Sequence, residues 1–547
     1  MDYNYLADLL YPNIKTLPAD MEARYPKRQL PEGAKVTRFA PSPTGFLHLG
    51  NLYGAFTDER LAHTSGGVFY LRIEDTDAKR TVPGGVELII KTLASFGVEF
   101  DEGAVIDGDS GAYGPYRQSE RAEIYQTYAK QLIRDGKAYP CFCTEEELEA
   151  IRTKQEAEKL NPGYYGEFAI WRDAPIEKIE EKLKDGVPFV LRFRSDGNLE
   201  NHFKFKDEIK GEINVTENDI DHVILKSDGI PTYHFAHAVD DHLMGTTHVV
   251  RDESWLSTLP FHIQLFKALG FKMPKYCHTA QVMKLDNGNK RKISKRKDPE
   301  FAATFYHEKG YPAAATREYL ITLLNSNFEE WRLANPTAPI DDFKFTTKKM
   351  SVSGSLFDMD KLADISKNVI SRMTADEVYD GVLEWAKEYD AEFAEKLEAD
   401  PVLAKSVLAI GRGGKKPRKD IMIWSEVKDY MGFFYDDYYK ITDEFPENIP
   451  ADERAQIFSD YAEMYSEDDD NNAWFEKVKE ISEKYGYTSD MKAYKADPSS
   501  FKGSVTDVSN LIRIALTGRA NSPDLCTICK LMGKEKVKSR VLAAAGK

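Results

Sequence analysis

Two motifs that lie far apart in the chain contain residue types that could bind a nucleotide. In the first, RFAPSPTGFLHLGN at residues 38–51, prolines and glycines surround a turn from a strand into a helix, with His48 at the turn. Phosphate groups bind at such turns because free backbone amides point toward them. In the second, RKISKRK at residues 291–297, the side chains of Lys292, Ser294 and Lys295 form a basic loop. This loop could stabilise the charge of a triphosphate that is attacked at its α-phosphorus.

Each motif also has a simpler interpretation. The first could be a glycine-rich turn, and the second could be a solvated basic loop or a general nucleic-acid patch. The presence of both in one chain favours a single ATP site to which both contribute.

The elements around the first motif predict an α/β fold. Residues 36–39 form a predicted strand, and apolar positions from Leu52 to Ala62 predict a helix. A second strand at 68–73 and a second helix at 86–96 repeat the alternation, which is typical of a parallel sheet. Ligands of such sheets bind at the carboxyl ends of the strands, where the first motif lies.

The alternation is then interrupted. Residues from about 120 to 215 predict helices and charged loops with a strand at 189–194, and a strand at 222–226 follows the interruption. Beyond about residue 360 the pattern is mainly helical. We therefore expect a sheet domain that is divided by an insertion and followed by a helical region.

Composition fits a large cytosolic protein with several domains. The chain has 547 residues, of which 42% are hydrophobic, enough for roughly three or four packed domains. It lacks an apolar run of about 18 residues that could span a membrane, and residues 1–34 lack the apolar region of a targeting signal. The five cysteines are few and odd in number, which favours reduced thiols.

The formal net charge of −16 disfavours nucleic-acid binding over the whole surface. Basic residues are nevertheless concentrated in three segments, 290–297, 411–419 and 534–540, while acidic residues cluster at 466–472. Each basic segment alone could be a solvated surface. Together they are consistent with a protein that contacts RNA locally.

The two motifs resemble the HIGH and KMSKS signatures of class I aminoacyl-tRNA synthetases, and within that class the chain resembles the glutamyl-tRNA synthetases. The resemblance covers nearly everything after about residue 35. It includes LRIEDTD at 71–77, GPYRQSERAEIY at 114–125, residues 225–255, KISKRK at 292–297 and, more faintly, ALTGRANSPDL at 515–525.

The resemblance implies a Rossmann-type parallel-sheet catalytic domain with an α+β acceptor-stem-binding insertion, followed by an all-α C-terminal anticodon-binding region of the bacterial type. The expected divisions are an N-terminal extension (1–34), the first half of the catalytic domain (35–119), the insertion (120–215), the second half (216–285), the KMSKS loop with a stem-contact domain (286–360), and the helical region (361–547).

The resemblance also implies roles for individual residues. His48 and Lys295 are the expected catalytic pair, and the expected ATP site consists of Ala40, Gly45, His48, Gly50, Asn51, Lys292, Ser294 and Lys295. A glutamate site needs a cation for the side-chain carboxylate and an anion for the α-amino group. The expected glutamate-binding residues are Arg38, Ala40, Ser42, Glu74, Tyr233, His237 and Arg251.

The implied activity joins L-glutamate to tRNA(Glu) with ATP and Mg²⁺, through a glutamyl-adenylate. An alternative is an enzyme that also glutamylates tRNA(Gln), and Arg418 is the anticodon candidate for that choice. The tRNA-modifying relative that attaches glutamate to queuosine lacks the anticodon-binding half, so the helical tail disfavours it. Retained His48, Lys295, Arg38 and Glu74 disfavour an inactive RNA-binding relative. A monomer is usual for the resemblance.

The chain departs from the family pattern at several positions. Asn51 replaces the second histidine of HIGH, Arg296 replaces the last serine of KMSKS, and His237 stands where asparagine is expected. Some relatives bind zinc in the insertion through Cys-x-Cys and a later Cys-x-His. Here only Cys141 and Cys143 are retained, with Phe168 and Ile170 at the later positions, and two thiolates cannot close a tetrahedral site. We therefore expect no zinc.

Overall fold

A computed structural model describes residues 1–77, 79–294 and 297–546. The chain forms two compact units. One consists of Met1–Phe305 with Arg317–Asp358, and the other of Tyr306–Thr316 with Met359–Lys547. The first unit contains the expected glutamate-binding residues and the first nucleotide motif.

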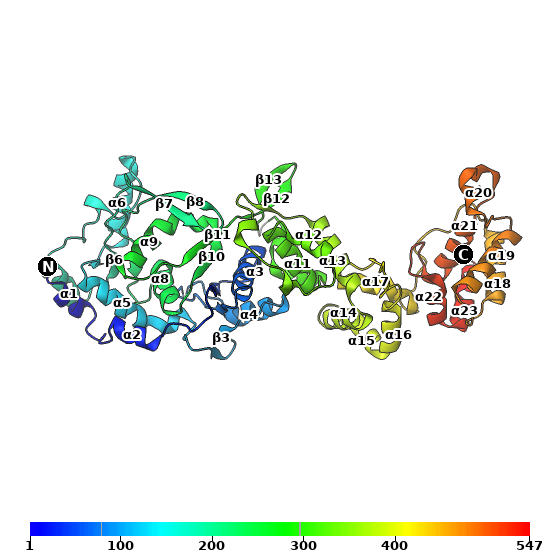
Figure 1. Ribbon diagram of the computed structural model, residues 1–547, viewed down its shortest axis with the longest axis horizontal. Helices are drawn as coiled ribbons and strands as arrows, with labels where there is room; N and C mark the ends of the chain where they lie inside the picture. Colours follow the sequence, from blue (N-terminus) through cyan, green and yellow to red (C-terminus); the bar gives the residue numbers. More distant parts are fainter. Residues whose placement is uncertain (78, 295–296, 547) are drawn as a thin grey trace. The chain divides into compact units, whose positions relative to one another are not determined.

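The parallel strands of the first unit form two hydrogen-bonded groups, β1-β2-β3-β4 before the insertion and β10-β11 after it, and β3, β10 and β11 are labelled in Figure 1. β1 pairs in parallel with β2, β2 with β3, and β10 with β11. The two groups meet just before β10, where Thr247 N donates to Val36 O at 2.9 Å. β4 adds an antiparallel edge. The bounds are β1 (Val36–Phe39), β2 (Val68–Leu71), β3 (Glu102–Val105), β4 (Gly108–Ser110), β10 (His248–Asp252) and β11 (Lys275–Thr279).

This arrangement confirms the predicted parallel sheet. The predicted strand at 68–73 ends at Leu71 in the structure, because Ile73 instead forms an isolated bridge with Arg117. The crossover helices are α3 (Leu49–His63), α4 (Gly85–Ser95), α8 (Tyr233–Leu243) and α9 (Leu259–Ala268), with a 3₁₀ turn η3 (Glu253–Thr258) after β10. Helix α3 contacts both β1 and β10, so it crosses the point where the strand order reverses, which is where sheets of this kind bind ligands.

The insertion has its own antiparallel sheet. β5 pairs with β6 and β6 with β9, while β7 and β8 form a separate hairpin. The strand predicted at 222–226 is thus present as β9, and it joins the sheet of the insertion. The bounds are α5 (Ala122–Arg134), β5 (Ala138–Cys141), α6 (Glu145–Ala157), α7 (Ile176–Lys184), β6 (Val190–Phe193), β7 (His202–Asp207), β8 (Gly211–Thr216) and β9 (Val223–Leu225).

The first two residues of the second motif, Arg291 and Lys292, lie in a strand and not in a loop. β12 (Val282–Asp286) and β13 (Asn289–Lys292) form an antiparallel hairpin, and β14 (Ser355–Leu356) pairs with β12. The turn is Asn287–Gly288, with φ of 50° and 82°. An Asn-Gly pair between strands is a strong hairpin signal, since both residues tolerate positive φ. Beyond the hairpin follow η4 (Pro299–Phe301), α10 (Ala303–Lys309), α11 (Ala313–Leu324) and α12 (Phe328–Ala334).

The N-terminal extension is ordered and packs on α5. Its helices α1 (Tyr3–Leu10) and α2 (Pro18–Arg24) lie beside α5, as Figure 1 shows. The Lys130 ammonium of α5 donates to Tyr11 O at 2.9 Å and to Ile14 O at 2.8 Å. Arg28 Nε donates to Met244 O at 2.7 Å. The extension is therefore fixed to both the insertion and the sheet domain.

The second unit is helical, as predicted for the C-terminal region. A single apolar core runs through it, from Ile370 to Ala544. Among the described residues, none of the helices combines the length and apolar character needed to cross a membrane. The bounds are α13 (Met359–Arg372), α14 (Ala375–Tyr389), α15 (Ala391–Ala399), α16 (Pro401–Leu408), α17 (Val427–Met431), α18 (Ala451–Met464), α19 (Asn471–Lys484), α20 (Met491–Ala496), α21 (Val505–Thr517), α22 (Leu525–Met532) and α23 (Lys534–Ala544).

Candidate active site

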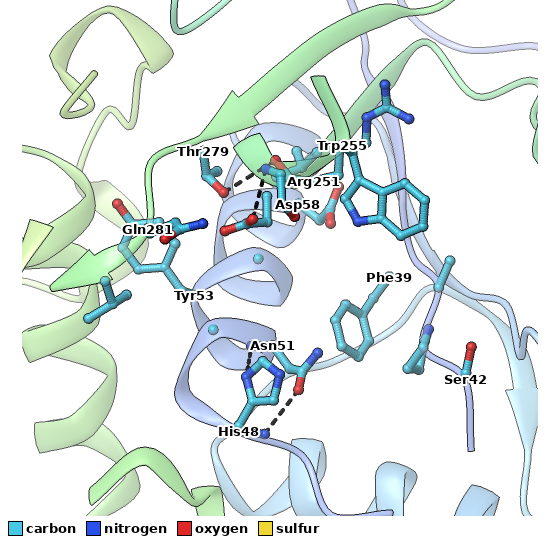
Figure 2. A pocket seen from close by; sticks show the side chains of 18 of the residues that line it. Phe39, Ser42, His48, Asn51, Tyr53, Asp58, Arg251, Trp255, Thr279 and Gln281 are labelled. Atoms are coloured by element: carbon cyan, nitrogen blue, oxygen red, sulfur yellow. Dashed lines mark hydrogen bonds between the residues drawn. The ribbon is translucent and has the colours of Figure 1, made fainter. Parts of the chain in front are cut away.

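A cavity of about 610 Å³ opens at the carboxyl ends of β1 and β10 (Figure 2). It brings together most of the expected ATP-binding and glutamate-binding residues: Arg38, Ala40, Ser42, His48, Gly50, Asn51, Glu74, Tyr233, Arg251 and Lys292. Gly45, His237 and Ser294 do not line it. Lys295 lies outside the described residues. Two motifs that are distant in sequence therefore contribute to one cavity.

His48 is the N-cap of α3 and is held in a reciprocal cap with Asn51. His48 N donates to Asn51 Oδ1 at 3.0 Å, and Asn51 N donates to His48 Nδ1 at 3.3 Å. The ring also stacks on Phe301 at 4.5 Å. Because Nδ1 accepts a hydrogen bond, the neutral ring carries its proton on Nε2, which makes Nε2 a donor. The departure from the HIGH signature at Asn51 thus has a structural role in orienting His48.

Gly50 leaves room for the His48 ring. A Cβ on Gly50 would lie 3.1 Å from His48 Nδ1, tighter than ordinary contact. Although the N–H groups of His48 and Asn51 are used in the cap, the positive end of the α3 dipole lies at the cavity. This end of the cavity is suited to phosphate.

The second motif faces the same end through Lys292, the last residue of β13. Asp298 accepts hydrogen bonds from Ser294 N at 2.9 Å and from Arg291 Nη2 at 2.6 Å. Hydrogen bonds from Arg291 keep the pKa of Asp298 below its usual range. The backbone of Ser294 is therefore tied to β13 through Asp298, although Ser294 does not line the cavity.

The opposite end of the cavity rests on a buried ionic network. Asp241 Oδ1 lies 3.2 Å from Arg38 Nε and 2.7 Å from Arg72 Nη1. Arg72 Nη2 in turn lies 3.1 Å from Glu74 Oε1. Burial alone would raise the pKa of Asp241, but Arg38 and Arg72 keep it well below its usual range. Arg72 thus connects the carboxylate that holds Arg38 with the one that faces the cavity.

Glu74 differs from Asp241 in charge state. Burial raises the pKa of Glu74 to about 7, against the lowering effect of Arg72 and Arg38. Its carboxyl group lines the cavity and would recover its charge beside a cationic ligand group. An ammonium group fits this position.

Arg251 and Tyr233 also line the end of the cavity that contains Arg38 and Glu74. Arg251 Nη2 is buried without a hydrogen-bond partner among the described residues, although Arg251 lines the cavity. The Tyr233 ring lies between the cavity and His237, on which it stacks at 5.8 Å. His237 is completely buried, with Nδ1 2.6 Å from Asp241 Oδ2 and Nε2 2.8 Å from the Tyr276 hydroxyl. His237, which was expected to contact glutamate, therefore lies behind the cavity wall and does not line the cavity.

Several residues of the site were not predicted. Asp58, Trp255 and Thr279 line the cavity, while Arg72 and Asp241 support it from behind. Arg72 lies in LRIEDTD and Asp241 in HAVDDH. Because each charged residue stands within an apolar segment, both could have been predicted to be buried and paired. Their partners could not be identified, because the Arg38–Asp241 contact spans 203 residues.

The Cys-x-Cys pair of the insertion is bridged by a tyrosine. The Tyr164 hydroxyl lies 3.5 Å from Cys141 Sγ and 3.4 Å from Cys143 Sγ. Phe168 is buried in the position where a zinc ligand would stand, and Ile170 is exposed. Within the described ranges, no group of three or more His, Cys, Asp or Glu is placed to hold a metal. The absence of zinc stays a prediction.

Arg418 lies in the second unit, on a cavity of about 490 Å³. Its Nη2 donates to Asp420 Oδ1 at 3.0 Å. Other polar and aromatic side chains line the same cavity: Lys367, Lys419, Tyr430, Arg519 and Asn521. Three carboxylates, Asp420, Glu426 and Asp429, line it as well, so the cavity contains both donors and acceptors beside an aromatic ring.

Comparison with known families defines the class of protein. A family model described as the catalytic domain of class I tRNA synthetases (E and Q) matches residues 35–364, and a model of an anticodon binding domain matches residues 416–545. The parallel sheet, with His48 at the start of α3, belongs to this class.

Individual relatives define the family. A glutamate–tRNA ligase from Acetivibrio thermocellus is 54% identical over 99% of both chains, and one from Clostridium perfringens is 50% identical over 99% of this chain and 100% of the relative. The crystal structure of a glutamate tRNA ligase from Elizabethkingia meningosepticum in complex with its amino acid is 28% identical, covers 94% of this chain and 99% of the other, and has a TM-score of 0.74. The chain belongs to the glutamate–tRNA ligase family.

Proposed function

We propose that this protein joins glutamate to tRNA, using ATP to activate the amino acid. One observation carries the proposal: a single cavity has a capped histidine, a helix N-terminus and Lys292 at one end, and Arg38, Glu74 and Arg251 at the other. The first end suits a triphosphate and the second suits an amino acid with two carboxylates.

The reaction needs positioning more than a side-chain nucleophile. The α-carboxylate of glutamate attacks the α-phosphorus of ATP, which forms glutamyl-adenylate and releases diphosphate. A terminal ribose hydroxyl of tRNA then attacks the activated carbonyl, and AMP leaves. Holding both substrates in one cavity makes the first step effectively unimolecular. His48 Nε2–H and Lys292, together with Lys295, stabilise the negative charge that develops on the phosphates.

The ligand contacts follow from the geometry of the cavity. Arg251, with an unpaired Nη2, takes the side-chain carboxylate, and Glu74 takes the α-ammonium group. Arg38, Ser42 and Tyr233 line the space between them. Mg²⁺ would enter bound to the phosphates of ATP, at the end of the cavity that His48 and Lys292 line, and would supply further positive charge there.

Glutamate binding should depend on pH through Glu74. Only the ionised carboxylate attracts the α-ammonium group, and the pKa of Glu74 in the empty site is raised to about 7 by burial. The KM for glutamate should therefore fall as pH rises to about 7 and level off above it, with a limiting slope of about tenfold per pH unit below. Steady-state kinetics between pH 5.5 and 8.5 measure this.

Glutarate is the matched ligand for this prediction, since it has both carboxylates and no ammonium group. Its inhibition constant should stay flat over the same range. A glutamate KM that is equally flat would contradict the role of Glu74, and Glu74→Gln should remove the pH dependence.

The direct test of the proposed function is glutamylation by the purified chain. We expect tRNA(Glu) to accept glutamate with release of AMP, and no charging without ATP. The tRNA(Gln) alternative is tested in the same assay by charging both purified tRNAs in parallel. Equal rates would favour relaxed specificity, and Arg418→Ala should then change the ratio of the two rates. Failure to charge either tRNA would contradict the proposal.

We further propose that the enzyme acts as a monomer in the cytoplasm. All five cysteines are free thiols, in agreement with a reducing compartment. The divisions expected from the sequence, at residues 34, 119, 215, 285 and 360, remain part of this proposal. Light scattering of the purified chain gives its oligomeric state.

A further inference from the structure

The guanidinium of Arg251 is held by two histidine rings. Its Nε donates to His278 Nε2 at 2.9 Å, and its Nη1 lies 2.9 Å from His262 Nδ1. The group also lies over the Tyr276 ring, 4.6 Å from the centroid. Nη2 is left without a partner among the described residues, on a side chain that lines the cavity. The geometry therefore fixes the plane of the guanidinium and leaves one nitrogen for a ligand.

Both histidines must accept these bonds, since an arginine can only donate. His278 Nδ1 lies 2.7 Å from Asp207 Oδ2, which places the ring proton on Nδ1 and the lone pair on Nε2. His262 Nε2 lies 2.9 Å from His234 Nδ1, which places its proton on Nε2 and its lone pair on Nδ1. Burial keeps the pKa of His262 well below its usual range, and it also lowers the pKa of His278. The two rings are thus neutral acceptors.

Arg38, which also lines the cavity, is held differently. Arg38 Nε contacts the carboxylate of Asp241 at 3.2 Å, so much of its charge is compensated. In the described part of the chain, no carboxylate forms an ion pair with Arg251. A buried cation with neutral partners keeps its attraction for an added anion.

We propose that His262 and His278 are specificity-determining positioning residues, which aim Arg251 while leaving its charge for the side-chain carboxylate of glutamate. This inference rests on the proposed function. A carboxylate ligand pairs with Nη2 and compensates the charge. The amide of glutamine cannot compensate it, so glutamine leaves a buried cation unpaired.

The decisive experiment compares His262→Asn with His262→Asp. Oδ1 of either side chain can occupy the position of Nδ1 and accept from Arg251, and both lose the contact with His234. The two variants therefore differ in charge and little else. The readouts are the KM and kcat for glutamate in glutamylation, the glutamate Kd by calorimetry, and the ratio of kcat/KM for glutamate over glutamine.

We expect His262→Asn to keep the glutamate KM and Kd close to those of the wild type. His262→Asp should raise both by at least about 10-fold, with a much smaller change in kcat, and should lower the preference for glutamate over glutamine. His202→Asp, the same change at an exposed histidine on β7, is the control and should leave both constants unchanged. Equal KM values for the Asn and Asp variants would overturn the proposal.

A second pair keeps the test valid if His262→Asp does not fold. His278→Gln and His278→Glu place an oxygen near the position of Nε2, and the same difference in Kd is expected. The outcomes also separate this inference from the proposed function. If the wild type binds glutamate but charges no tRNA, the proposed function fails and the Kd comparison still decides the inference. If it does not bind glutamate, both fail.

Discussion

His48→Asn is expected to lower kcat for glutamyl-adenylate formation by about 10²- to 10³-fold, the usual cost of removing one donor to a developing negative charge. The variant separates the two roles of His48. Asparagine is a good N-cap, and its Oδ1 can accept from Asn51 N as His48 Nδ1 does at 3.3 Å. The distal Nε2–H that would meet the phosphate is lost.

ATP–diphosphate exchange, with and without tRNA, measures this effect. The KM for glutamate should change little, because His48 lies at the phosphate end of the cavity. His63→Asn, on the same helix but at its partly exposed last residue, should exchange at the wild-type rate. An exchange rate for His48→Asn within about threefold of the wild type would remove His48 from the mechanism.

Asp241→Asn is expected to destabilise the first unit by about 3–5 kcal/mol, because removing one partner of a buried ion pair leaves its counterpart uncompensated. Arg38 and Arg72 lie 3.2 and 2.7 Å from Asp241 Oδ1, and both guanidiniums are buried. Without the carboxylate charge, the two cations repel each other in the interior. Arg38 and Glu74 would also lose their common support, so glutamate binding should weaken together with stability.

Urea unfolding followed by tryptophan fluorescence measures the loss. The two units can unfold separately, so the transition of the first unit must be identified before a free energy is assigned. Asp77→Asn is the control, since Asp77 forms an exposed ion pair with Arg80, and such pairs contribute at most about 1 kcal/mol. A shift for Asp241→Asn no larger than that of the control would show that the network is not needed for stability.

The fold near the first motif follows from local sequence rules. The strand at residues 36–39, the helix that becomes α3 and the glycine-rich turn between them are all in the structure. The hairpin at 282–292 could have been predicted from Asn287–Gly288, but the basic character of the second motif suggested a loop. Local sequence patterns could therefore predict most of the strands, helices and turns at the phosphate end of the cavity.

The glutamate end of the cavity depends on contacts between residues far apart in the sequence, which local spacing rules cannot predict. Arg72 and Asp241 are 169 residues apart, and His278 and Asp207 are 71 residues apart. The position of His237 shows why ligand contacts could not be predicted from the sequence alone. The family resemblance implied that Tyr233 and His237 both contact the ligand, and they are four positions apart on one face of α8, but the Tyr233 ring ends the cavity. Which residue of a helical face reaches the ligand depends on packing from other elements.

The docking of the N-terminal extension has a consequence for synthesis on the ribosome. Residues 1–34 are translated before the partners that they contact in the fold, and Arg28 Nε binds the carbonyl of Met244, which is 216 residues later. At bacterial-type elongation rates of about 5–20 residues per second, that partner is made roughly 10–40 s afterwards. Leu6, Leu10 and Met21, which are buried in the finished protein, belong to a core that also contains residues of α5 and α8, so this core is complete only after α8 has been translated. Residues 1–34 therefore reach all their final contacts long after they have been made.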